Sequence, residues 1–290
     1  MTNKKTELKR LIIFLFFAFA ISWIPAIIFN KTLGYNDWFE TNKYPVLFWI
    51  GGFAPALANV LTRAITKEGW HDSMLHLNLK GNIKYYVAAF LIVVVLGIAE
   101  GITTTIIYGN GDFSDMGAGL NGIQIAGTIL TVLVTVPLLA FNTFGEEFGW
   151  RGYMNQKMEP LLGTTGTVIV GGIIWGLWHA VLTVEGHNFG KDYDGYPWLG
   201  ILLMCIFCTY MGIVLMWLTK KTGSIYPAAI MHAANNNGGG IVGQLFISGV
   251  PEDFSPDIAY RVIVSIPSML ICCVFLVLMI IDKKRKAKAN

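Results

Sequence analysis

The sequence predicts an all-α membrane protein that crosses the bilayer several times. Of its 290 residues, 54% are hydrophobic and only 13% are charged, whereas a soluble domain usually carries about 25% charged residues. The mean hydropathy is +0.56. The hydrophobic residues also gather in stretches of about 20, the length that spans a bilayer as a helix. We therefore expect a single membrane domain comprising residues 1–290.

About eight such stretches follow one another along the chain. The first comes after the basic segment 1–10 and is too long for the core of a signal peptide, so it predicts a transmembrane helix. The segment 68–82 is expected to lie on the surface between the second and third spans. The predicted spans are 11–29, 44–65, 85–108, 119–141, 165–184, 198–218, 225–247 and 259–281.

The distribution of Lys and Arg predicts the orientation. If the N-terminus is cytoplasmic, most of the 21 Lys and Arg residues fall on cytoplasmic segments, as the positive-inside rule requires. An even number of spans then places the C-terminus in the cytoplasm too. The basic residues lie at span ends, where anionic lipid attracts them. The net charge of +3 therefore indicates membrane lipid as a partner and gives no sign of nucleic-acid binding.

Two further features of composition limit the interpretation. The four cysteines all lie inside apolar runs and are expected to be small buried hydrophobes, not disulfides or metal ligands. The abundance of Lys, Ile and Asn suits a low-GC Gram-positive host, so a bacterial plasma membrane is the expected location. Glu100 lies in the third predicted span without a surrounding motif, and we interpret it as a packing or cavity-lining residue.

The segment 145–152, Gly-Glu-Glu-Phe-Gly-Trp-Arg-Gly, follows a long apolar run. A charged side chain deep in a bilayer costs about 2.5–3.5 kcal/mol on insertion scales. On a helix, Glu147 and Arg151 are four residues apart and share a face, whereas Glu146 is turned away from Glu147 by about 100°. One interpretation is a charged helix end at the membrane surface. The other is that Glu146 faces neighbouring helices and carries out chemistry.

Two histidines lie inside later spans. His179 is in the fifth and His232 in the seventh, with Asn235 and Asn236 three and four residues beyond His232 on the same helical face. Each histidine alone could make a helix-packing hydrogen bond. If the cytoplasmic turns lie at 161–164 and 222–224, the helical rise places both histidines and Glu146 within a hydrocarbon core about 30 Å thick. The sequence therefore predicts a polar site inside the bilayer.

These residue types suit hydrolysis of an amide. Glu146 can act as general base toward a water and then as acid toward the leaving amine, while one histidine holds that water. The second histidine and an asparagine can donate hydrogen bonds to a tetrahedral oxyanion. Alternatively, Glu146, His179 and His232 could bind zinc with one open position. The sequence has no His-Glu-x-x-His helix to support the metal and no nucleophile elbow to support Ser or Cys catalysis.

Three motifs occur in order: Glu-Glu-x-x-x-Arg-Gly at 146–152, Trp-x-x-x-His at 175–179 and His-x-x-x-Asn at 232–236. In this order and spacing they resemble the CPBP family of intramembrane proteases, which includes CAAX prenyl endopeptidases and bacteriocin-processing or self-immunity proteins. The resemblance covers residues 120–240, the predicted catalytic core. The family usually has Phe where this chain has Trp175.

The resemblance implies a role for each motif residue. Glu146 and His179 would activate water, and His232 with Asn236 would stabilise the oxyanion. Glu147 and Arg151 would orient the site. The implied activity is that of an intramembrane endopeptidase acting on small or C-terminal peptides of a peptide or protein substrate, in a cavity open to the cytoplasmic membrane face.

Two other classes of function remain as alternatives. A non-catalytic bacteriocin immunity protein could keep the fold and bind a bacteriocin or its receptor. A secondary transporter could use the intramembrane acids and histidines as a proton relay, although the sequence shows no internal repeat of the kind that many transporters have.

Overall fold

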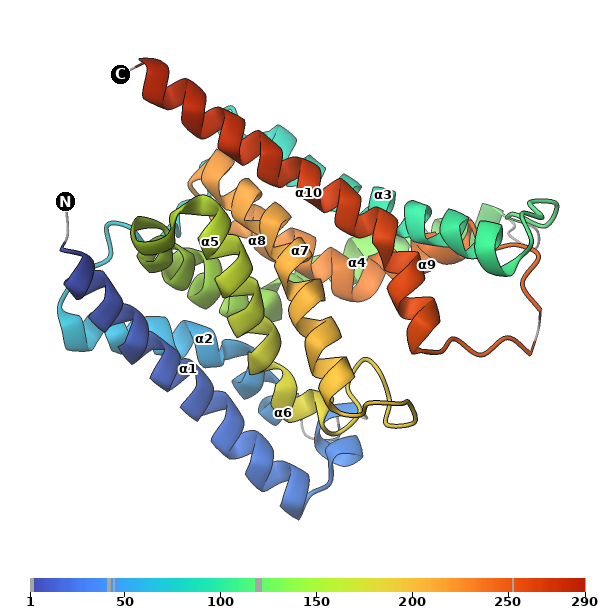
Figure 1. Cartoon of the computed structure of the whole chain (residues 1–290), viewed down its shortest axis with the longest axis horizontal. Helices are drawn as coiled ribbons and strands as arrows, with labels where there is room; N and C mark the ends of the chain where they lie inside the picture. Colours follow the sequence, from blue (N-terminus) through green and yellow to red (C-terminus); the bar gives the residue numbers. More distant parts are fainter. Residues whose placement is uncertain (1–2, 41–42, 44, 118–121, 252, 290) are drawn as a thin grey trace.

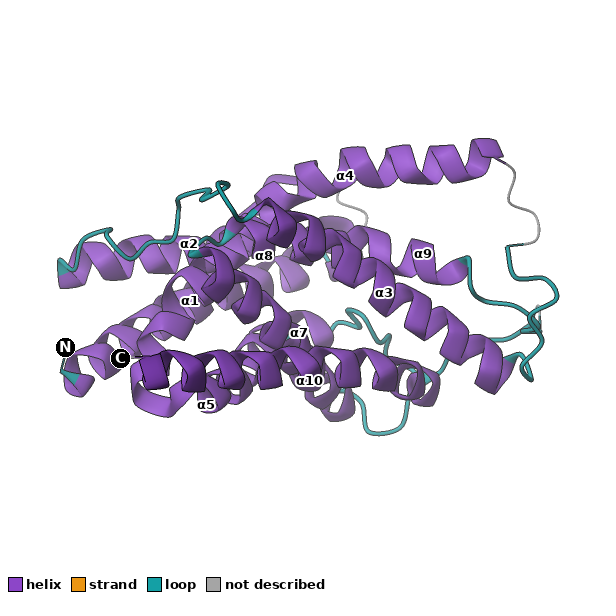
Figure 2. Ribbon diagram, turned by 90° about the horizontal axis from the view of Figure 1, so that it is seen from above, coloured by secondary structure: helices purple, strands orange, loops and turns teal. Residues whose placement is uncertain are grey.

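The computed structural model describes residues 3–40, 43, 45–117, 122–251 and 253–289, and these contain helices and loops but no strand. Long helices lie alongside one another, and both ends of the chain lie at the same end of the bundle (Figures 1 and 2). The helical elements are α1 (Lys4–Thr32), η1 (Asn36–Glu40), α2 (Pro45–Thr66), α3 (Ile83–Tyr108), α4 (Gly122–Gly149), η2 (Trp150–Met154), α5 (Asn155–Trp178), α6 (Ala180–Thr183), α7 (Trp198–Thr222), α8 (Tyr226–Ala234), η3 (Asn235–Gly239), α9 (Gly240–Gln244) and α10 (Ile258–Ala289).

The prediction of a helical, polytopic membrane protein is confirmed. The eight predicted stretches lie largely within helical segments, although 225–247 is divided among α8, η3 and α9, and residues 44 and 119–121 lie outside the described part. Within the described residues, 5 helical segments are long and apolar enough to cross a membrane. The number of spans and the side of the termini stay predictions. The five segments are Lys4–Thr32, Ile83–Tyr108, Val134–Trp178, Trp198–Thr222 and Ile258–Arg285.

The chain does not leave the helix at the Glu-Glu-x-x-x-Arg-Gly motif. Helix α4 passes directly into the π-helical turn η2 and then into α5, so the motif lies within one continuous helical path. The turn comes later, at Gly163, whose φ of 68° interrupts α5 and is easily adopted only by glycine. A second turn follows α7, where Gly223 caps the helix with φ 64°. Both turns lie where the sequence predicted cytoplasmic connections.

Small residues allow the central helices to approach closely. A Cβ atom added to Gly172 would lie 2.4 Å from Cα of Thr209, and one added to Gly176 would lie 2.4 Å from Cα of Cys205. The glycines are four residues apart on α5, as are their partners on α7. This is the small-xxx-small spacing that lets two membrane helices pack backbone against backbone. The close crossing fixes the position of Trp175 and His179 at the end of α5.

Aromatic side chains fill the space around this crossing. Trp150 of η2 is fully buried and makes edge-to-face contacts with Phe14 of α1 and Trp178 of α5, at ring-centroid distances of 5.7 Å in both cases. Such contacts add to the stability that burial itself provides. The turn that carries Arg151 is therefore packed on both sides and holds its side chains in fixed positions.

Candidate active site

The first motif is positioned by a close contact between α4 and α2. A Cβ atom added to Gly145 would lie 2.6 Å from the carbonyl oxygen of Gly52, and one added to Gly149 would lie 2.3 Å from Cβ of Pro55. Any larger residue would force the helices apart. The two glycines flank Glu146 and Glu147, so the contact holds both carboxylates at a fixed depth in the bundle.

Glu147 is fully buried and joins two motifs. Its Oε1 atom accepts hydrogen bonds from Nη1 of Arg151 at 3.0 Å and from Nδ1 of His232 at 2.8 Å. The pairing with Arg151 has the four-residue spacing that the sequence predicted. A buried carboxylate requires such partners, because an unpaired charge away from water is costly. Glu147 is therefore a structural centre that orients the His232 ring, and it is not a charged helix end at the membrane surface.

Glu146 points toward the second motif. Its Oε2 atom accepts a hydrogen bond of 2.8 Å from the indole Nε1 of Trp175. This contact joins α4 to α5 and engages one of the two carboxylate oxygens. The prediction that Glu146 faces other helices is confirmed by this contact.

The Trp175 ring lies among the other candidate residues. The guanidinium carbon of Arg151 is 4.1 Å from the ring centroid, a cation–π distance. The ring also meets the His232 imidazole edge to face, with centroids 5.3 Å apart. A single side chain thus contacts Glu146, Arg151 and His232 and keeps the first and third motifs in register.

His179 ends α5 and is buried. Its Nδ1 lies 2.9 Å from the carbonyl oxygen of Trp175, and its ring meets Trp178 edge to face at 4.8 Å. Because a carbonyl only accepts, we assign the proton to Nδ1. The other ring nitrogen, Nε2, is then an acceptor that can hold a water.

The asparagines of the third motif lie in the π-helical turn η3. The Asn235 amide donates to Oδ1 of Asn236 at 3.4 Å, and Asn236 is exposed. The third asparagine, Asn237, instead donates to the carbonyl oxygen of Ala233 at 3.0 Å. The π-helical winding gives these side chains a direction that a regular helix would not give, a common feature of functional sites.

A single cavity of about 1000 Å³ brings the motifs together. Its walls include Glu146, Trp175, His179, His232 and Asn236. Glu147 and Arg151 do not line it, because they lie behind the His232 and Trp175 rings. The structure therefore separates the candidate residues into a group that faces the cavity and a pair that supports it.

The metal alternative gains no support from the described side chains. Among the described residues, no group of three or more His, Cys, Asp or Glu side chains converges as a metal site would require. The printed contacts engage Nδ1 of each histidine, that of His179 with a carbonyl and that of His232 with Glu147, an arrangement that metal-binding histidines share. Zinc binding by Glu146, His179 and His232 therefore stays a prediction, and no step of the chemistry is derived through a metal.

Sequence reasoning missed two neighbours of the site. Asn142 lines the cavity one helical turn before Glu146, and its buried Oδ1 has no hydrogen-bond partner among the described residues. Cys208 of α7 lies with Sγ 4.0 Å from His179 Nδ1. The four-residue spacing from Asn142 to Glu146 was a readable signal, since both residues fall on one helical face. The proximity of Cys208 depends on the α5–α7 crossing and has no local signal.

Comparison with known proteins gives a family-model match that includes these residues and two similar relatives. Residues 128–238 match the family model of type II CAAX prenyl endopeptidase Rce1-like proteins. CAAX prenyl protease 2 of Methanococcus maripaludis is 30% identical over 122 residues, which cover 40% of this chain and 44% of that protein. Lysostaphin resistance protein A of Staphylococcus haemolyticus is 24% identical over 169 residues, which cover 58% of this chain and 41% of that protein. The chain thus spans less than half the length of these curated relatives.

Proposed function

We propose, from the confirmed resemblance of this chain to the CPBP family of intramembrane proteases, that it is an endopeptidase that hydrolyses a peptide bond with a water activated by Glu146. The observation that carries the proposal is the convergence of Glu146, His179, His232 and Asn236 on one cavity. Glu146, His179 and His232 come from segments far apart in the sequence. His179 and His232 are buried, and polar side chains inside a bilayer are costly and usually functional.

In the first step, Glu146 removes a proton from a water held against Nε2 of His179. The resulting oxygen nucleophile attacks the carbonyl carbon of the scissile bond, and the carbonyl oxygen becomes an oxyanion. Donors aimed at this oxygen stabilise the transition state more than the substrate. His232, when it carries both ring protons, donates through Nε2, and the Asn236 amide is the second donor.

In the second step, the protonated Glu146 gives its proton to the nitrogen of the scissile bond as the carbon–nitrogen bond breaks. The products are a carboxylic acid and an amine, and the net change is the addition of one water. Glu147 and Arg151 take no part in proton transfer. They act as positioning residues, because Glu147 holds Nδ1 of His232 and thereby aims Nε2 at the cavity.

The test is cleavage of a quenched-peptide library by the purified protein. Glu146→Gln keeps the size of the side chain and an oxygen that can accept from Trp175, but it cannot accept the water's proton. We expect cleavage to fall by about 10²- to 10⁴-fold, the range for a lost general base. Glu100→Gln is the matched control, because Glu100 lines the same cavity but is bound to Ser268. Equal activity of wild type and Glu146→Gln would refute the proposal.

A bacteriocin immunity function is the second candidate, favoured by the similarity to a protein named for lysostaphin resistance. It predicts that protection of cells does not depend on hydrolysis. A Glu146→Gln protein that folds and protects as well as wild type would support it over the protease.

A further inference from the structure

The cavity lies toward one end of the bundle. On α1 its lining residues fall between Ile21 and Phe29, and on α3 between Gly97 and Thr104. Gly97 is 14 residues beyond the start of α3, which corresponds to about 20 Å along the helix axis. On α10, whose direction is opposite, the lining residues fall in the first half, from Tyr260 to Met269. Each of these helices thus contributes the half that lies far from the two chain termini.

The basic residues mark the other end. The N-terminal turn of α1, the segment 67–84, the end of α7 and the tail of α10 carry most of the Lys and Arg, and the termini lie together at that end (Figures 1 and 2). The loops 109–117 and 245–251 lie at the opposite end (Figure 2). By the positive-inside rule, the basic end faces the cytoplasm. The cavity therefore lies nearer the extracytoplasmic side.

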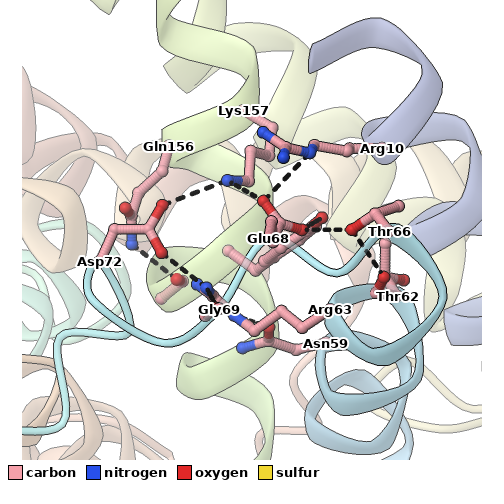
Figure 3. Close-up of polar contacts among 12 residues, drawn as sticks. Arg10, Asn59, Thr62, Arg63, Thr66, Glu68, Gly69, Asp72, Gln156 and Lys157 are labelled. Carbon is pink, nitrogen blue, oxygen red and sulfur yellow. Dashed lines mark hydrogen bonds and ion pairs between the residues drawn. The ribbon is translucent and has the colours of Figure 1, made fainter. Parts of the chain in front are cut away.

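A network of ion pairs closes the basic end, and we call it the basic-end cluster (Figure 3). Lys157 of α5 contacts Glu68 at 2.6 Å and Asp72 at 3.2 Å, and Arg63 of α2 contacts Asp72 at 2.6 Å. Arg10 of α1 contacts Glu68 at 3.2 Å. The cluster balances three acids against three bases, and most of these side chains are buried. Its members are Glu7, Arg10, Arg63, Glu68, Asp72 and Lys157.

The loop 67–82 lies across the same end and packs beneath the site. Met74 and Leu75 lie against Phe148 and Ile225, two residues of an apolar cluster beside the first motif. The backbone N–H of Ile225 donates to the carbonyl oxygen of Met74 at 3.2 Å. The predicted surface segment is thus anchored to the bundle, and its apolar side chains fill the route from the cytoplasm to Glu146.

We propose that the peptide enters this site from the end opposite the basic termini, so that the substrates are peptides present at the extracytoplasmic face of the membrane. The inference rests on the proposed protease function for its substrate and on the positive-inside rule for its sidedness. It differs from the cytoplasmic opening that the family resemblance implied. The physical reason is that the ion-pair cluster and the loop 67–82 close one end, while the cavity walls extend toward the other.

The test is thiol labelling from each side of the membrane. In a variant whose four cysteines are replaced by serine or alanine, Ser22→Cys and Ser265→Cys each place a thiol of nearly unchanged size on the cavity wall. Ser114→Cys marks the far loop and Lys80→Cys marks the basic-end loop, since both residues are exposed. Intact cells and inverted vesicles are treated with a membrane-impermeant maleimide. The reactivity of each thiol in detergent is checked first.

We expect the two cavity thiols to react from the same side of the membrane as the Ser114→Cys thiol. Their labelling should be at least tenfold faster in intact cells than in inverted vesicles. Labelling that follows the Lys80→Cys marker, or that is equally fast from both sides, would overturn the proposal. The measurement is repeated with Glu146→Gln, because labelling does not require hydrolysis. If the wild-type protein cleaves no peptide in the cleavage assay, the protease function is refuted and the labelling result still stands. If the cavity thiols are labelled from the basic side, the proposed entry route is refuted and the protease function still stands.

Discussion

Nδ1 of His232 lies 2.8 Å from Oε1 of Glu147, although the two residues are separated by 85 positions in the sequence. The same oxygen accepts from Arg151 at 3.0 Å. Glu147 thus connects the first and third motifs, and the orientation of His232 depends on a carboxylate that does not itself reach the cavity. Several expected outcomes depend on this separation of roles.

Glu147→Gln is expected to lower kcat with little change in KM, because the amide holds His232 less well without altering the cavity wall. We expect a loss of about 10- to 100-fold, smaller than for Glu146→Gln. In the double variant with His232→Ala the effects should not add, since residues that act as a unit show non-additive losses. Steady-state kinetics of the single and double variants would check this. Additive losses would show that Glu147 acts independently of His232.

Trp175→Phe is expected to lower activity by at most about 10- to 150-fold. The phenyl ring keeps the contacts with Arg151 and His232, and only the hydrogen bond to Glu146 is lost, a contribution of about 1.5–3 kcal/mol at most for a charged acceptor. Trp175→Leu removes the ring as well and should lose considerably more. Peptide cleavage by both variants, compared at equal thermal stability, measures the difference. Equal losses would mean that the ring contacts do not matter.

Chelator treatment is expected to leave peptide cleavage unchanged, because among the described residues no three His, Cys, Asp or Glu side chains are grouped so that they could hold a metal ion. The measurement is activity before and after prolonged dialysis against a chelator, followed by addition of zinc. Activity lost on dialysis and restored by zinc would contradict the mechanism through Glu146 alone.

Acid is expected to weaken the basic-end cluster. Burial acts to raise the pKa of Glu68, but the hydrogen bonds from Lys157 and Tyr153 outweigh it and hold this pKa below its usual value of 4.5. Burial likewise acts to raise the pKa of Asp72, and Arg63 brings it below the usual 3.8. A carboxyl group whose pKa is lower in the folded state than in the unfolded state adds to the free energy of unfolding at any pH above its unfolded-state pKa. This stabilisation is lost as the pH falls through the pKa of the folded state.

We therefore expect the unfolding temperature in detergent to fall as the pH decreases below about 4.5, the ordinary pKa of Glu. Glu68→Gln should lower the unfolding temperature at pH 7 and flatten the acid dependence, because one of the titrating groups is gone. Thermal unfolding between pH 7 and pH 3 checks this. An acid dependence that is as steep in the variant as in wild type would show that Glu68 does not contribute to it.

Gly176→Ala is expected to destabilise the protein by about 1–3 kcal/mol, the usual cost of overpacking. The added methyl group would lie 2.4 Å from Cα of Cys205, so the backbones of α5 and α7 must separate. Gly51→Ala is the matched control, because no atom lies within 4 Å of a Cβ at that position. Thermal unfolding of the two variants is the measurement. A Gly176→Ala protein as stable as the control would contradict the close crossing.

The sequence by itself determined the class of fold and predicted the candidate residues of the site. Hydrophobic stretches of bilayer length are a local property, and so are the four-residue spacings that place Glu147 with Arg151 and His232 with Asn236. The turns expected at 161–164 and 222–224 contain Gly163 and Gly223, where the structure places them. These features require only the period of the helix and the chemistry of each side chain.

The tertiary structure alone decided how these residues meet. One interpretation of the sequence was a charged helix end at the membrane surface, but packing buries Arg151 against Glu147 and the Trp175 ring, because the helical path continues through η2 instead of ending at the motif. The sequence also interpreted 68–82 as a surface segment, whereas its acids pair with Arg63 and Lys157 and its apolar residues close one end of the bundle. Contacts between helices depend on crossings of residues far apart in the chain, and no local pattern specifies them.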